Sequence, residues 1–125
     1  MTVLIIDDEE VIHLLAERIL TNAGHAVVVA KSGTEGIRIF REQSAQIGAV
    51  LLDAFMPGLT GAETLRRLRE INPDLPCIFS SGSVEAESEL TPDLRTSTWF
   101  LQKPYQAREL STMIDQIAAR RTPAT

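Results

Sequence analysis

The sequence contains a single cysteine, Cys77, so no disulfide bond can form within the chain. This cysteine lies in an apolar run, residues 77–79, which favours a buried thiol in a reducing, cytoplasmic setting over a reactive one. No apolar run approaches the length of a membrane span, and the first, residues 3–6, leads straight into four acidic residues, unlike a signal peptide. The composition therefore predicts a cytoplasmic protein that does not enter a membrane.

Positive charge is also scarce. There are 12 lysines and arginines against 17 aspartates and glutamates, which gives a net charge of −5. A chain with this balance has no overall positive field to attract nucleic acid or an anionic membrane surface. We therefore expect no direct contact with nucleic acid.

What the sequence has instead is a regular alternation of short apolar runs and amphipathic stretches. Its 125 residues suit one domain with a hydrophobic core. Helical patterns separate the apolar runs, so we predict an α/β fold, a flavodoxin-like (βα)5 three-layer sandwich whose parallel sheet has the order 2-1-3-4-5. The strands are expected at residues 3–6, 26–29, 49–52, 77–80 and 98–101.

The helices are marked less evenly. Ser32–Glu35 and Thr60–Glu63 have the spacing of capping boxes, which begin helices. The weakest pattern lies in residues 82–97, where a proline at position 92 interrupts a short helical stretch, so we expect a short or mobile fourth helix. For the first helix we expect one buried face, composed of Ile12, Leu15, Ala16 and Ile19.

The stretch Val50–Gly58 places one acid at the end of a buried strand. Its apolar residues show no polar alternation, which is typical of a parallel strand covered on both faces, and Asp53 ends the run just before a Pro-Gly turn. Ligands bind at this edge of open α/β sheets, because the loops between strands and helices converge there. Asp53 is therefore a candidate reactive group, although a turn-capping role explains this segment equally well.

The other informative polar residues also lie where predicted strands end. Asp7 and Asp8 follow the first strand, Ser81 follows the fourth and Lys103 follows the fifth. In the order 2-1-3-4-5, these strand ends are close to Asp53. Three carboxylates packed together repel one another, so a hard divalent cation such as magnesium (Mg²⁺, or Mn²⁺) fits the site. A carboxylate nucleophile, such a cation and a lysine together indicate phosphoryl transfer to Asp53.

Each of these residues has a simpler explanation when it is taken alone. The acidic run 7–10 would suit the start of a helix, Lys103 would suit a solvated loop, and Ser81-Gly82 would suit an ordinary turn. The arginines in residues 66–69 favour a solvated helix face over a docking patch. It is the combination at four strand ends of one fold that favours a phosphoryl-transfer site.

Other classes of protein share part of this pattern. A flavodoxin-like cofactor protein needs a hydroxyl- and glycine-rich loop after the first strand to hold phosphate, whereas residues 7–10 are all acidic. A phosphohydrolase with an aspartate nucleophile normally has an Asp-x-Asp motif at that place. The remaining alternative is a pseudo-receiver, a docking module that is not phosphorylated, against which the complete set of site residues argues.

Four motifs stand together at these strand ends: Asp7-Asp8, Asp53–Pro57 with Gly61, Ser81-Gly82 and Lys103-Pro104. With them, the sequence resembles the receiver domain of two-component response regulators, from Val3 to about Ala119. The resemblance implies a receiver domain at residues 1–121 and a flexible tail at 122–125. Such a domain would be a stand-alone regulator or part of a larger protein such as a hybrid histidine kinase.

The resemblance also implies a role for each site residue. Asp53 would accept a phosphoryl group from the phosphohistidine of a histidine kinase or phosphotransfer protein, and Lys103 would pair with that group. Asp8, Asp53 and the backbone carbonyl of Phe55 would bind Mg²⁺ directly, while Asp7 would act through water. No other cofactor is implied.

A two-state switch follows from the same resemblance. Ser81 would move towards the phosphoryl group, and Phe100 would rotate into the space left behind. These movements would alter the face formed by the fourth helix, the fifth strand and the last helix, through which a homodimer would also form. The chain would catalyse only its own phosphorylation and dephosphorylation, so we do not expect an enzyme that turns over a separate substrate.

Phe55 leads to a first prediction, because it places an apolar ring two residues after Asp53, where the ring would shield an acyl phosphate from water. We expect the phosphorylated chain to lose phosphate slowly, and Phe55→Asn to lose it faster. The measurement is the rate of dephosphorylation of the two proteins. Rapid release of phosphate that the substitution left unchanged would contradict this prediction.

Overall fold

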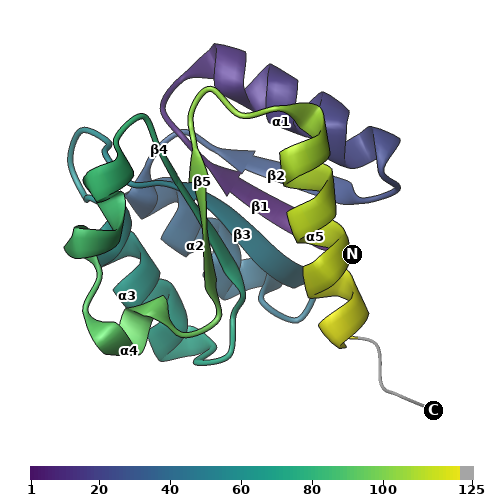
Figure 1. Ribbon diagram of the computed structural model, residues 1–125. Coiled ribbons are helices and arrows are strands. Elements are labelled where there is room, and N and C mark those ends of the chain that lie inside the picture. The colour runs from purple at the N-terminus through teal and green to yellow at the C-terminus, as the bar shows by residue number, and fades with distance from the viewer. Residues whose placement is uncertain (122–125) are drawn as a thin grey trace.

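The computed structural model describes residues 1–121, apart from the side chains of Val84 and Arg121. The tail expected at 122–125 lies outside the described residues. No helix among those described is both long enough and apolar enough to cross a membrane. The elements alternate along the chain, as Figure 1 shows: β1 (Thr2–Ile6), α1 (Glu10–Asn22), β2 (Ala26–Ala30), α2 (Gly33–Gln43), β3 (Ile47–Asp53), α3 (Gly61–Ile71), β4 (Cys77–Ser81), the 3₁₀ helix η1 (Val84–Glu89), α4 (Pro92–Arg95), β5 (Thr98–Gln102) and α5 (Ala107–Arg121).

The strands form one parallel sheet in the order β2-β1-β3-β4-β5, which confirms the predicted fold class and strand order. β3 is buried over its whole length, because it lies in the middle of the sheet with helices on both faces. Ile6 lies opposite Leu52, and Asp53 lies opposite Ser80. This register brings the carboxyl ends of β1, β3 and β4 to one edge of the sheet.

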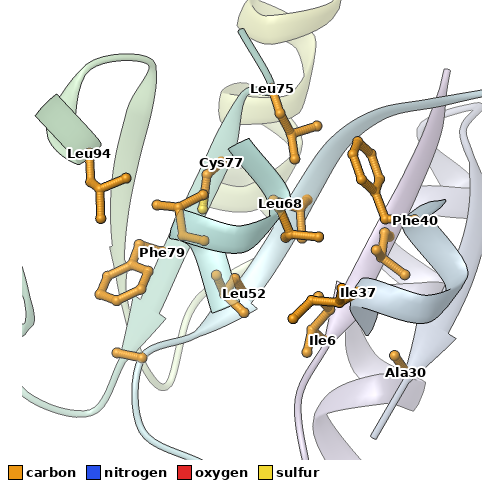
Figure 2. Close-up of a cluster of buried hydrophobic side chains, with 14 of the residues drawn as sticks. Ile6, Ala30, Ile37, Phe40, Leu52, Leu68, Leu75, Cys77, Phe79 and Leu94 are labelled. Carbon is orange, nitrogen blue, oxygen red and sulfur yellow. The ribbon is translucent and has the colours of Figure 1, made fainter. Parts of the chain in front are cut away.

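The helices lie in two layers, one on each face of the sheet (Figure 1). Alternate residues of a strand point to opposite faces, so Ile6 belongs to the cluster that includes side chains of α2, α3 and α4, while Ile5 belongs to the cluster that includes side chains of α1 and α5. Figure 2 shows part of the first cluster, where Ile37 of α2 lies beside Ile6 and Leu68 of α3 also faces the sheet. The buried thiol of Cys77 belongs to this cluster, as expected. Removal of these side chains from water is the main favourable term in folding.

The first turns of α2 and α3 are fixed by side-chain caps. Thr60 and Glu63 form a complete capping box at the start of α3, as predicted. At the start of α2, the backbone N–H of Glu35 donates to Ser32 Oγ over 3.1 Å. These bonds satisfy N–H groups that have no partner within a helix. The two loops that lead into α2 and α3 are thereby held at the sheet edge that carries Asp53.

Helix α1 buries a different set of side chains from the one predicted. Ala16 and Ile19 are buried as expected, but Leu15 is 40% exposed. Leu20 packs in the core instead. Successive residues point about 100° apart around a helix, so Ala16, Ile19 and Leu20 define a buried face that leaves Leu15 at its edge. The apolar residues of this helix are too numerous for the pattern alone to show which stripe faces the sheet.

The segment between β4 and β5 has no full-length helix. η1 spans six residues and α4 only four, which confirms the short fourth helix. Arg69 of α3 anchors the segment, because its guanidinium donates to the carbonyls of Leu75 (3.0 Å), Leu94 (2.8 Å) and Ser97 (3.0 Å). The expectation that Arg69 belongs to a solvated helix face is therefore wrong. Hydrogen bonds to three backbone carbonyls offset the loss of its hydration.

Candidate functional site

Asp53 ends β3 at the base of a hollow of about 400 Å³, and its side chain is nearly buried, with the residue only 5% exposed. The chain turns sharply here: the Ala54 N–H donates to the Ser80 carbonyl over 2.8 Å, and the Phe55 N–H donates to Asp53 Oδ1 over 3.4 Å. These bonds hold the carboxylate towards the hollow. The other walls of the hollow come from α1, which contributes Ile12, and from four loops, which contribute Glu9, Phe55, Gly82, Lys103 and Pro104.

Gly61 allows α3 to begin directly against the end of β3. A Cβ atom at this position would lie 2.4 Å from the Asp53 carbonyl oxygen and 2.7 Å from Ala54 Cα, both backbone atoms. The Gly61 N–H donates to the Ala54 carbonyl over 2.9 Å, which closes the loop between them. Only glycine fits so close an approach. The glycine in the motif therefore fixes the loop that carries Phe55.

Four acids gather at the hollow. Asp7 is buried, Asp8 and Glu9 are exposed, and the carboxylates of all three together with Asp53 offer oxygen atoms within 4.8 Å of one another. The register of β1 beside β3 causes this clustering, because Asp7 follows Ile6 directly at the same sheet edge. The structure thus brings together all three predicted carboxylates. It adds Glu9, which belongs to the acidic run 7–10 but was given no site role from the sequence.

Lys103 supplies the positive charge among these acids. Its Nζ lies 2.7 Å from Asp7 Oδ2, 3.5 Å from Asp53 Oδ1 and 3.5 Å from Glu9 Oε1. The backbone places it there, because the Lys103 N–H donates to the Ser81 carbonyl over 2.7 Å. The ammonium therefore sits where a group bound to Asp53 would meet it.

Burial and the neighbouring charges together shift the pKa values of Asp53 and Lys103. Burial, followed by the charge of Asp7, raises the pKa of Asp53 to about 6 despite the attraction of Lys103. Burial alone would lower the pKa of Lys103, but its hydrogen bond to Asp7 and the charges of Asp53, Asp7 and Glu9 raise it above the usual value. The lysine is thus firmly charged, and the cluster keeps an excess of negative charge.

The donor set fits a hard divalent cation. All of its ligand atoms are oxygens, which Mg²⁺ and Mn²⁺ prefer. Asp7 already uses Oδ1 to accept from the Glu9 N–H and Oδ2 to accept from Lys103. Asp8 and Asp53 are therefore the acids best able to ligate a metal directly, and Asp7 is better suited to act through water.

Ser81 and Phe100 lie beside this cluster and not within it. Ser81 is buried, and its Oγ accepts a hydrogen bond from the Ser83 N–H over 2.9 Å. Phe100 is half-buried and meets Phe79 edge to face, with 6.2 Å between ring centroids. Both Ser81 and Phe100 line a second hollow of about 210 Å³ beneath η1. The two expected switch residues thus share a space into which a side chain can move.

Sequence comparison places this chain in a known family. The family model described as the response regulator receiver domain matches residues 3–115. The chain belongs to this family. Among solved structures, the receiver domain protein of Clostridium thermocellum has a TM-score of 0.86 and 32% identity, with 96% of this chain and 95% of that chain covered. The receiver domain of the hybrid histidine kinase CckA has a TM-score of 0.80 and 27% identity, with 94% and 98% covered.

Receiver domains of this kind occur within longer proteins. The sensor kinase CckA of Brucella abortus (strain 2308) is 32% identical over 116 residues, which are 93% of this chain but only 12% of that protein. The transcriptional regulatory protein AfsQ1 of Streptomyces coelicolor is 30% identical over 119 residues, 95% of this chain and 52% of that protein. The chain thus spans about half or less of the length of these curated relatives.

Tyr105 is a site neighbour that the sequence reasoning missed. It is buried, and its hydroxyl has no hydrogen-bond partner among the described residues. Burial, and then the charges of Asp7 and Asp53, raise its pKa, because a phenolate there would be poorly solvated and repelled by both carboxylates. A signal was present, since the chain's one tyrosine directly follows Lys103-Pro104.

The raised pKa of Asp53 predicts an effect on stability in the metal-free receiver domain. The folded state holds a proton on Asp53 up to about pH 6, whereas the unfolded state releases it near 3.8, so stability falls as pH rises between these values. Asp53→Asn should remove this fall in stability, because asparagine does not ionise. We expect the variant to exceed the wild type in free energy of unfolding by up to about 3 kcal/mol at pH 7 and to match it near pH 4.

The measurement is urea unfolding of both proteins across this pH range in EDTA. Asp74→Asn is the matched control, since Asp74 is exposed in a loop, and it should leave the profile unchanged. Added Mg²⁺ should reduce the difference in free energy of unfolding between Asp53→Asn and the wild type at pH 7. Equal stability of Asp53→Asn and the wild type at pH 7 in EDTA would contradict the argument that Asp53 is destabilised by its surroundings.

Proposed function

We propose that this receiver domain accepts a phosphoryl group on Asp53 from the phosphohistidine of a histidine kinase or phosphotransfer protein, in a Mg²⁺-dependent phosphorelay. The observation that carries the proposal is the position of Lys103 Nζ, 3.5 Å from Asp53 Oδ1 and within a cluster of four acids. The Asp53 carboxylate is nearly buried yet lines a hollow, and the Lys103 ammonium lies beside it. This arrangement supplies a nucleophile and a partner for the incoming charge.

The chemistry needs an ionised Asp53. With a pKa of about 6, the carboxylate is mostly charged at neutral pH and can attack phosphorus. The new bond joins an Asp53 oxygen to phosphorus, and the bond between phosphorus and the donor imidazole nitrogen breaks, with its electron pair kept by the nitrogen. Lys103 pairs with the phosphoryl oxygens as they approach. When bound, the divalent cation would neutralise further phosphoryl charge. The chain itself is the substrate, so it is not a multiple-turnover enzyme.

Phosphorylation would act on the second hollow. The Ser81 hydroxyl, which now accepts from the Ser83 N–H over 2.9 Å, would turn to a phosphoryl oxygen. Phe100 would then occupy more of the 210 Å³ hollow that it lines with Ser81. Because Phe100 belongs to β5, this movement would change the face of α4, β5 and α5. A homodimer or another output partner would use that face.

A protein donor must also reach Asp53, and α1 offers a surface for it. Val11 and Leu14 are 73% and 70% exposed, and Leu15 adds to the same stripe. Ile12, one turn before Leu15 in the same helix, lines the hollow above Asp53. Exposed apolar residues in such a group are typical of an interaction site. We expect a phosphohistidine-bearing partner to cover this α1 stripe (Val11, Leu14 and Leu15).

The proposal predicts Mg²⁺-dependent phosphorylation of Asp53. Incubation with acetyl phosphate and Mg²⁺ should raise the mass of the intact protein by one phosphoryl group, because the site holds both the nucleophile and its cationic partner. Asp53→Asn and an EDTA control should show no gain. Absence of any gain with acetyl phosphate, and then with a range of phosphorylated kinases, would favour a docking module that is not phosphorylated and would remove the catalytic role of Asp53.

A second prediction separates docking from chemistry. The kinase in this test is one that phosphorylates the wild type. Leu14→Ser should lower the rate of phosphoryl transfer from it by roughly tenfold, because a central apolar contact is lost. Labelling by acetyl phosphate, which needs no docking, should be unchanged. Ile71→Ser is the matched control, as Ile71 is also exposed but lies on α3, in the other helix layer. Equal rates for Leu14→Ser and the wild type with the kinase would exclude the α1 stripe.

A further inference from the structure

A second concave surface lies between α2 and α3, in the helix layer opposite α1 and α5 (Figure 1). It is a groove of about 320 Å³, and it shares no lining residue with the hollow at Asp53. Its floor contains the apolar side chains of Ile37 and Leu59, and its rim carries Arg38, Arg41 and Arg67. Figure 2 shows Ile37 directed towards the core beside Ile6, so only the edge of this side chain reaches the groove.

The groove concentrates positive charge on a protein whose net charge is −5. Arg38 pairs with Glu42, which lines the same groove, over 3.6 Å. Arg41 and Arg67 have neither an ion pair nor a hydrogen-bond acceptor among the residues whose side chains the structure describes. Two guanidinium groups from neighbouring helices are thus left without an anion at one concave site.

The other arginines of α3 have partners, which makes Arg67 distinct. Arg66 lies 3.8 Å from Asp93 and donates to Thr91 over 3.2 Å. Arg69 donates to backbone carbonyls around α4. Both therefore serve the contact between α3 and the segment before β5. Arg67 faces the opposite way around the helix, into the groove beside α2.

The shape of the groove decides which anion fits. A small-molecule site is normally enclosed and has buried polar groups that fix orientation, whereas the arginines here are exposed on an open rim. An extended acidic segment can cross an open groove, place one apolar side chain on Ile37 and Leu59, and pair its carboxylates with the guanidinium groups. Arginine suits this role because its planar fork matches a carboxylate.

We propose that the α2–α3 groove (Ile37, Arg38, Arg41, Leu59 and Arg67) docks an acidic peptide segment of a partner protein, anchored by one apolar side chain. The paired Glu42 leaves the groove with an excess of positive charge, so an acidic segment is attracted and a basic one is repelled. Because the groove and the Asp53 hollow share no residue, binding of this segment does not require phosphorylation.

The test uses a fluorescein-labelled, glutamate-rich peptide with one central leucine as the probe. Fluorescence polarisation should show that the wild type binds it and that the double variant Arg41→Glu/Arg67→Glu binds at least roughly tenfold more weakly. The double variant Arg18→Glu/Arg108→Glu makes the same change in net charge at exposed positions on α1 and α5, and it should bind like the wild type. Amide shifts in NMR spectra should map to α2, Leu59 and α3.

Several outcomes would overturn the proposal. If both double variants bound the peptide equally weakly, the attraction would come from net charge alone. Undiminished binding of a peptide with serine in place of leucine, or displacement by inorganic phosphate, would show a simple anion site. Self-association that the Arg41→Glu/Arg67→Glu variant abolishes would make a second copy of the chain the occupant. Asp53→Asn should bind the peptide like the wild type, so failure of phosphorylation and failure of docking are distinguishable.

Discussion

The ion pairs of Lys103 with Asp7 and Asp53, at 2.7 Å and 3.5 Å, are the interaction on which the site depends. They join residues that follow three different strands, and they exist only because β1, β3, β4 and β5 lie side by side in the parallel sheet. A buried carboxylate without a partner would be costly. The ammonium offsets part of that cost, and the capped loop, Gly61 and the bond from the Lys103 N–H to Ser81 keep the partners in register.

The compensation is incomplete, and this links the fold to its function. Burial and then the charge of Asp7 outweigh the attraction of Lys103, so the pKa of Asp53 remains raised, to about 6, in the absence of a metal. An excess of negative charge would attract a divalent cation, and the bound cation would neutralise part of the charge of an incoming phosphoryl group. The same imbalance that we expect to weaken the metal-free fold would therefore favour binding of the proposed ligands, a common relation between stability and activity.

The two helix layers present different surfaces to partners. On one side, α1 exposes the apolar stripe of Val11, Leu14 and Leu15 next to the Asp53 hollow, which suits a donor that must deliver a phosphoryl group. On the other, α2 and α3 frame a groove with unpaired arginines and an apolar floor. Because the sheet separates these surfaces, a phosphodonor and an acidic segment can bind without competing for the same residues. The short α4, anchored by Arg69, belongs to the face of α4, β5 and α5, which we proposed as the output surface.

The sequence by itself determined the strands, their order, the family and the acids that surround Asp53, because these depend on local patterns: apolar runs, capping boxes and polar residues where strands end. The sequence was insufficient wherever the pattern left open which way a side chain points. Leu15 and Arg69 are both in helices with dense apolar or basic patterns, and only packing against the sheet and the loop before β5 decided that Leu15 is exposed and Arg69 is held by carbonyls. Glu9 and Tyr105 join the site through the meeting of loops distant in sequence. The groove at Arg41 and Arg67 likewise exists only because two helices lie side by side, since charge along one helix does not reveal what faces it from the next.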